Sequence, residues 1–132
     1  MKVLVIDTEK TKPDIVDTPG GLEEWCRLLN CSVIDIATRT IAGKPYDLII
    51  DDEGLFRGGG AKVTALNSKG EPQLVGNLVI CNFNEETGEE APLSDSDIFH
   101  ILKNIVILTE DTKGEDRKPQ MWLAVSNVDF MG

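Results

Sequence analysis

Two short stretches of the chain space their apolar residues as an amphipathic helix does, while most other apolar residues stand in short strand-like runs. Residues 22–29 and 98–105 each place apolar side chains at i, i+3, i+4 and i+7, which puts them on one helix face. The runs 3–6, 46–50 and 74–80 are rich in Val, Leu and Ile, as strands are. The pattern predicts an α+β fold with a mixed, mostly antiparallel sheet of about five or six strands and two helices on one face.

The termini of the two predicted helices carry local signals. Ser94 and Asp97 have the spacing of a capping box, in which each side chain accepts a hydrogen bond from the other residue's backbone N–H. Leu93 and Ile98 occupy the flanking apolar positions of a hydrophobic staple. For the first helix, Thr18 is the expected N-cap residue, ahead of a proline, and the helix is expected to end near Asn30.

Length and charge limit the class of protein. A chain of 132 residues is the size of one domain. Its 13 basic and 23 acidic side chains give a net charge of −10, whereas proteins that bind nucleic acid directly display basic patches. The sequence therefore argues against a direct nucleic-acid partner. The chain has one histidine and three scattered cysteines, too few suitably spaced ligands for an ordinary zinc site. We expect no metal and no cofactor.

The cysteines and the apolar runs indicate the compartment. Cys26, Cys31 and Cys81 are odd in number and irregularly spaced, unlike a secreted disulfide framework. Each stands beside apolar residues, so we expect buried free thiols. The apolar runs at 3–6 and 105–108 are four residues long, too short for a signal peptide or a membrane span. A cytoplasmic protein without a membrane partner is expected.

The strand predicted at 46–50 leads into an acidic turn and then a glycine-rich loop. Glycines let backbone N–H groups approach an anion, and an arginine adds a forked donor. The carboxylates would accept hydrogen bonds from a basic group of a partner. The predicted binding patch comprises Tyr46, Asp51, Asp52, Glu53, Arg57, Gly58, Gly59 and Gly60.

Two alternative interpretations involve carboxylates. Asp51, Asp52 and Glu53 could hold Mg²⁺ for a phosphohydrolase, although consecutive residues of an extended backbone point to opposite sides. A second acidic strip could imitate the phosphates of DNA and inhibit a nucleic-acid-binding enzyme. Its members are Glu85, Glu86, Glu89, Glu90, Asp95 and Asp97.

Three segments, 1–6, 46–55 and 74–80, resemble a family of small proteins from phages, plasmids and other mobile elements, the domain-of-unknown-function 3846 family. The resemblance covers residues 1–108, which we expect to form the α+β domain. After Gly54 a Pro-Asn-Arg-like segment typical of that family is replaced by a glycine run. Residues 109–132 lie beyond the similarity, and we expect there a charged loop followed by a C-terminal strand or tail. The resemblance implies a mobile-element context and no activity.

These observations favour a non-enzymatic binding protein of a phage or mobile element, because the chain offers no recognisable set of catalytic residues. Such a protein would inhibit a host factor or sequester a small host signal. The expected partner is accordingly a host protein or a small anionic ligand, and self-association into a homo-oligomer is a further alternative.

Overall fold

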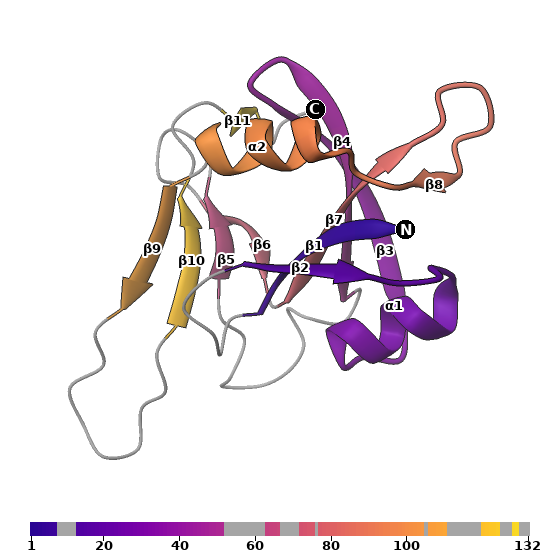
Figure 1. Ribbon diagram of the computed structural model, residues 1–132. Coiled ribbons are helices and arrows are strands. Elements are labelled where there is room, and N and C mark those ends of the chain that lie inside the picture. The colour runs from indigo at the N-terminus through magenta and orange to yellow at the C-terminus, as the bar shows by residue number, and fades with distance from the viewer. Residues whose placement is uncertain are drawn as a thin grey trace.

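An antiparallel β-sheet with one helix on each face forms the centre of the structure (Figure 1). The computed structural model describes residues 1–7, 13–51, 63–66, 72–75, 77–104, 106–110, 120–124 and 128–129. The elements of this central layer are β1 (Lys2–Ile6), β2 (Asp14–Asp17), α1 (Leu22–Leu29), β3 (Ile34–Ile41), β4 (Lys44–Asp51), β7 (Leu78–Phe83), β8 (Glu90–Ala91), α2 (Asp95–Asn104) and β11 (Val128–Asp129).

The strand order of this sheet is β11-β3-β4-β7-β1-β2, and the short β8 pairs with the end of β7. Every pairing in it is antiparallel. The longest ladder joins β3 to β4 through a two-residue turn at Ala42 and Gly43, whose φ angles are 47° and 87°. Two consecutive positive φ angles are the signature of a type I′ hairpin turn, which follows the natural twist of the strands. The expectation of an α+β fold with a mostly antiparallel sheet is confirmed.

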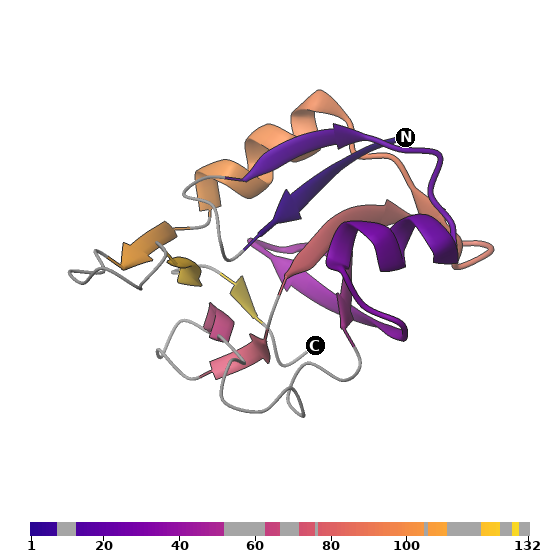
Figure 2. The same cartoon turned by 90° about the horizontal axis from the view of Figure 1, so that it is seen from below.

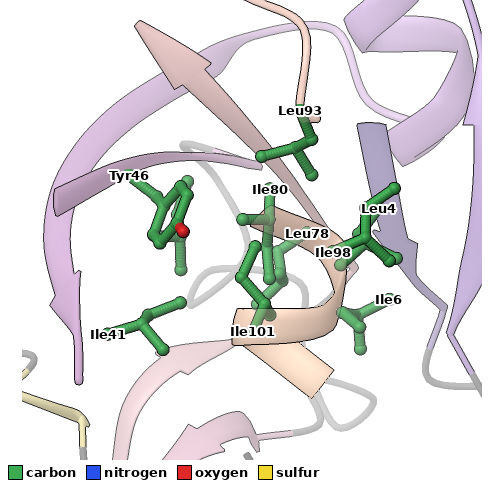
Figure 3. Packing of buried hydrophobic residues seen from close by; sticks show 10 residues of the cluster. Leu4, Ile6, Ile41, Tyr46, Leu78, Ile80, Leu93, Ile98 and Ile101 are labelled. Carbon is green, nitrogen blue, oxygen red and sulfur yellow. The ribbon is translucent and has the colours of Figure 1, made fainter. Parts of the chain in front are cut away.

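Alternating side chains of the strands enter two separate apolar clusters, one under each helix. In β1, Leu4 and Ile6 face α2, while Val3 and Val5 face α1. The cluster under α2, shown in Figure 3, contains Leu4, Ile6, Ile41, Tyr46, Leu48, Leu78, Ile80, Leu93, Ile98 and Ile101. The cluster under α1 contains Val3, Val5, Trp25, Leu29, Ile49, Val79 and Cys81.

The prediction that both helices cover one face of the sheet is therefore wrong. Figures 1 and 2 show α2 and α1 on opposite sides of β1 and β2. The reason is visible in β1 and β7, each of which has four consecutive buried residues, 3–6 and 78–81. A strand that is apolar at every position needs cover on both faces, whereas one-sided cover would leave polar residues at alternate positions.

A second, four-stranded sheet has the order β6-β5-β10-β9. Its strands are β5 (Val63–Leu66), β6 (Pro72–Val75), β9 (Val106–Glu110) and β10 (Gln120–Ala124). Only the β5–β10 pairing is parallel. The single strand expected at 74–80 is in fact two strands, β6 and β7, which belong to different sheets. Within residues 109–132, where a C-terminal strand or tail was expected, the structure has β10, and the next strand, β11, pairs with β3 of the central sheet.

The helix ends follow local chemistry in two of three cases. The capping box is confirmed, because Ser94 Oγ accepts from the Asp97 N–H and Asp97 Oδ2 accepts from the Ser94 N–H, each at 3.0 Å. Asn30 ends α1, as expected, and the structure shows it in the left-handed conformation. Thr18 is not the N-cap of α1, since the helix begins at Leu22 and Gly21 precedes it. Instead the Thr18 hydroxyl accepts a hydrogen bond from the Gly20 N–H at 3.1 Å and shapes the approach to the helix.

Candidate functional site

The carboxylate of Asp97, in the first turn of α2, collects hydrogen bonds from three parts of the fold. Lys44 and Tyr46 reach it from β4, Asn82 reaches it from β7, and Ser94 precedes the helix. We call these five residues the Asp97 cluster. The cluster ties the N-terminus of α2 to two neighbouring strands of the central sheet.

Both oxygens of Asp97 are fully engaged. Oδ1 accepts from the Tyr46 hydroxyl at 3.1 Å and from the Lys44 ammonium. Oδ2 accepts from Asn82 Nδ2 at 2.9 Å and from Ser94, through its N–H at 3.0 Å and its hydroxyl at 2.9 Å. A carboxylate has about four lone-pair sites, so five donors saturate it.

These contacts determine the protonation state of the cluster. Burial opposes ionisation of Asp97, but the hydrogen bonds from Lys44, Ser94 and Tyr46 outweigh burial and lower its pKa to about 2. Burial, followed by the nearby negative charge of Asp97, raises the pKa of Tyr46. A saturated carboxylate with a low pKa is a poor proton acceptor near neutral pH. The Asp97 cluster is therefore an anchor for α2 and not an acid–base pair.

His100 stands one helical turn beyond Asp97 on the same side of α2. Its Nε2 lies 2.8 Å from the Ile41 carbonyl oxygen, so Nε2 carries a proton and donates it. The imidazole ring centroid is 6.3 Å from that of Tyr46. His100 thus ties α2 to the end of β3, next to the Asp97 cluster.

A second buried carboxylate, Asp47, lies on the opposite face of β4. It accepts a hydrogen bond from the Thr38 hydroxyl at 2.9 Å and is directly opposite Cys81 in the ladder. Burial raises the pKa of Asp47, against the effect of the Thr38 hydrogen bond. Burial, together with the charges of Asp47 and Glu90, raises the pKa of the Cys81 thiol to about 12. Cys81 is buried, as expected.

The structure does not bring the two described members of the predicted binding patch together. Tyr46 is buried under α2, where its hydroxyl binds Asp97. Asp51 is five residues further along β4, about 17 Å away on an extended strand. An odd separation also places Asp51 on the α1 face. The other members, Asp52, Glu53, Arg57 and Gly58 to Gly60, lie outside the described residues.

The six residues of the acidic strip have different environments. Glu85, Glu86 and Glu89 are exposed in the turn between β7 and β8, and Glu90 is half-buried in β8. Asp95 is exposed and forms an ion pair with Lys2 at 2.8 Å. Asp97 is buried in the Asp97 cluster. Two of the six carboxylates are thus directed at lysines of this chain, and the strip does not form a uniform row of exposed negative charge.

Several large apolar side chains are exposed, and three of them belong to α2 or to the face of the sheet that α2 covers. Phe99 is 69% exposed, and Leu102, one helical turn later, is 40% exposed. Ile15 of the edge strand β2 is opposite Leu4, which places it on the α2 face as well. We call Ile15, Phe99 and Leu102 the α2 apolar surface. Among the described residues, the other large apolar side chains that are exposed are Leu22, Val33 and Ile36.

Most of the Asp97 cluster is not predictable from the sequence. Ser94 and Asp97 are the exception, because a capping box is a local pattern. Lys44, Tyr46 and Asn82 approach Asp97 from 53, 51 and 15 residues away. The spacing of residues in the sequence does not predict contacts across such separations.

The geometry defines a small α+β protein with an anchored helix and an exposed apolar surface. None of the helices in the described part of the chain is long and apolar enough to span a membrane. Within the same residues, no group of three or more His, Cys, Asp or Glu side chains is placed to hold a metal ion.

Comparison with protein families assigns the chain to a particular family. The profile of a domain of unknown function, DUF3846, matches residues 1–106. The chain belongs to the DUF3846 family, as the resemblance predicted. Searches of curated proteins and of solved structures returned no match.

Proposed function

We propose that this DUF3846 protein is a non-enzymatic interaction protein of a phage or other mobile element, and that it binds a host protein through the α2 apolar surface. The main support for this proposal is the exposure of the Phe99 side chain. Large aromatic side chains are enriched in interfaces, where their burial contributes strongly to affinity. The mobile-element context rests on the family resemblance.

The helix that carries Phe99 is held firmly in place. Ile98 and Ile101 of α2 are buried, and Leu93 is buried just before the helix. The Asp97 cluster ties the first turn of α2 to β4 and β7. A rigid helix presents its outer side chains with little further loss of conformational freedom on binding, which favours affinity.

Charged groups border the α2 apolar surface. The Lys103 ammonium lies 5.9 Å from the centroid of the Phe99 ring, and the Lys2–Asp95 ion pair lies at the other end of the helix. Apolar residues within a polar rim are the usual composition of an interface. With a net charge of −10, the chain as a whole would attract a basic partner at long range.

Three other functions have weaker support. A DNA mimic needs a row of accessible negative charges, and Asp95 and Asp97 are paired with Lys2 and Lys44. Anion binding by Arg57 and the glycine loop, and a phosphohydrolase built on Asp51, Asp52 and Glu53, depend mainly on residues outside those described. These hypotheses remain predictions from the sequence.

The test is photo-crosslinking in the bacterial host, with benzoylphenylalanine at position 99 and, as a control, at Thr87, which is exposed in the β7–β8 turn. We expect one host protein to crosslink at position 99 and not at 87. With that protein purified, Phe99→Ser is expected to weaken binding at least about tenfold. Leu22→Ser, which removes another exposed apolar side chain outside this surface, should leave binding unchanged.

The proposal is wrong if both positions crosslink the same set of proteins, or if Phe99→Ser and Leu22→Ser weaken binding equally. A crosslink only to a second copy of the chain would instead establish a homo-oligomer and rule out the α2 apolar surface as the site for a host protein.

A further inference from the structure

Two of the three cysteines lie together at the end of α1, contrary to the expectation that all three are buried. Cys26 is in the last turn of the helix and Cys31 follows its end, and both are half-buried. Only Cys81 is fully buried. The first two thiols are thus open to small reagents in a way that the third is not.

The backbone at the end of α1 brings these residues close. Asn30 adopts the left-handed conformation, with φ 53° and ψ 52°. The Cys31 N–H then donates to the Cys26 carbonyl at 3.0 Å, and the Asn30 N–H donates to the Arg27 carbonyl at 3.3 Å. This pair of hydrogen bonds is the Schellman motif, in which the side chains at the positions of Cys26 and Cys31 commonly touch.

The hydrogen bond limits the separation of the two Cα atoms. The path from Cys26 Cα through its carbonyl and the Cys31 nitrogen to Cys31 Cα totals about 7 Å even if straight, and it bends at each atom. Disulfides form between Cα atoms roughly 4.4–6.8 Å apart. The Cys26 Sγ also lies 3.6 Å from the Ser32 carbonyl oxygen, so this side chain points toward the segment that contains Cys31.

We propose that Cys26 and Cys31 form a reversible intrachain disulfide by exchange with a low-molecular-weight disulfide such as oxidised glutathione. One protein thiolate attacks a glutathione sulfur, forms a mixed disulfide and releases one glutathione thiolate. The second protein thiolate attacks the protein sulfur of that mixed disulfide and releases the second glutathione. The two protein thiols lose two electrons and two protons, and oxidised glutathione becomes two reduced glutathione molecules.

The chain provides a direct test, because Arg27 separates the two cysteines. The folded protein is treated with oxidised glutathione, quenched in acid, alkylated in denaturant and digested with trypsin. Cleavage after Arg27 places Cys26 in peptide 11–27 and Cys31 in peptide 28–39. We expect a species in which these two peptides are joined and which separates on reduction. Cys81 should be recovered as an alkylated thiol.

Variants distinguish the proposed geometry from general reactivity. Cys31→Ser should abolish the joined peptides and leave Cys26 as a glutathione adduct. Asn30→Gly keeps the left-handed conformation accessible and should preserve the yield of joined peptides. Asn30→Val, which is strained at positive φ, should lower that yield several-fold. Glutathione adducts on unlinked peptides of the parent protein, or linkage found only in covalent dimers, would overturn the proposal.

Discussion

The hydroxyl of Tyr46 in β4 donates a hydrogen bond to the carboxylate of Asp97 in α2, 3.1 Å away and in the interior of the protein. The contact joins segments 51 residues apart, and Lys44 and Asn82 bind the same carboxylate. Removal of the carboxylate would therefore leave several donors without an acceptor at once.

Asp97→Ala is expected to lower the free energy of unfolding by about 2–4 kcal/mol. It leaves the buried Tyr46 hydroxyl unpaired and removes the partner of Lys44. Urea denaturation followed by circular dichroism measures the change. Asp95→Ala is the matched control, since it removes an exposed carboxylate of the same helix and should have a far smaller effect. Equal effects of the two variants would contradict the role assigned to Asp97.

The stability of the protein should depend on pH through Asp97. Its pKa is lowered from 3.8 to about 2 in the folded state, so the folded chain binds fewer protons than the unfolded chain in this window. The ionised Asp97 carboxylate thus contributes about 2 kcal/mol to the free energy of unfolding. This contribution is complete above the pKa of the unfolded chain and decreases as the pH falls toward 2. The pKa of Asp47 is raised in the folded state, so its effect on stability is opposite: it lowers the free energy of unfolding as the pH rises. The measurement is the difference in unfolding free energy between the parent protein and Asp97→Asn from pH 7 to 2.5, and a constant difference would contradict the prediction.

Two substitutions at Tyr46 separate the hydrogen bond from the packing of the ring. Tyr46→Phe keeps the buried ring and loses the bond to Asp97, which should destabilise by about 1–2 kcal/mol. Tyr46→Ala also empties the space under α2 and should destabilise by about 3–5 kcal/mol. Thermal or urea unfolding gives both values. If Tyr46→Phe proves as damaging as Tyr46→Ala, packing of the ring is not the larger contribution.

The β3–β4 turn offers a stabilising substitution. Ala42 has φ 47°, a conformation that is unfavourable for alanine and that asparagine tolerates better. Ala42→Asn would produce the Asn-Gly pair preferred in type I′ turns and should raise the unfolding free energy by about 0.5–1 kcal/mol. Gly43→Ala, at φ 87°, should destabilise the same turn. A loss of stability in Ala42→Asn would show that the positive φ of Ala42 does not lower the stability of the protein.

Phe99→Ser should change the unfolding free energy by less than about 0.5 kcal/mol, because the ring is largely exposed. Ile101→Ala, two residues later and fully buried, should lower it by about 2–5 kcal/mol. Differential scanning calorimetry of the two variants checks this contrast. Marked destabilisation by Phe99→Ser would mean that the residue belongs to the core, and its use as a binding probe would then be invalid.

The sequence by itself determined the features that depend on neighbouring residues. The capping box of α2 needs only Ser94 and Asp97, which one helical turn brings together. The end of α1 at Asn30 follows from the tolerance of asparagine for the left-handed conformation. The strands β1 and β4 were predicted because β-branched and apolar runs favour extended backbone. These preferences operate within a few residues and can be read without the rest of the fold.

The tertiary structure alone decided what depends on residues far apart in the chain. It placed the two helices on opposite faces and gave Asp97 its partners from β4 and β7. It also buried Tyr46 while leaving Cys26 and Cys31 half-buried. Burial and distant hydrogen bonds depend on which strands become neighbours, and the whole chain sets that arrangement through the packing of both apolar clusters. A local pattern can therefore identify an element, but only the assembled sheet determines what that element faces.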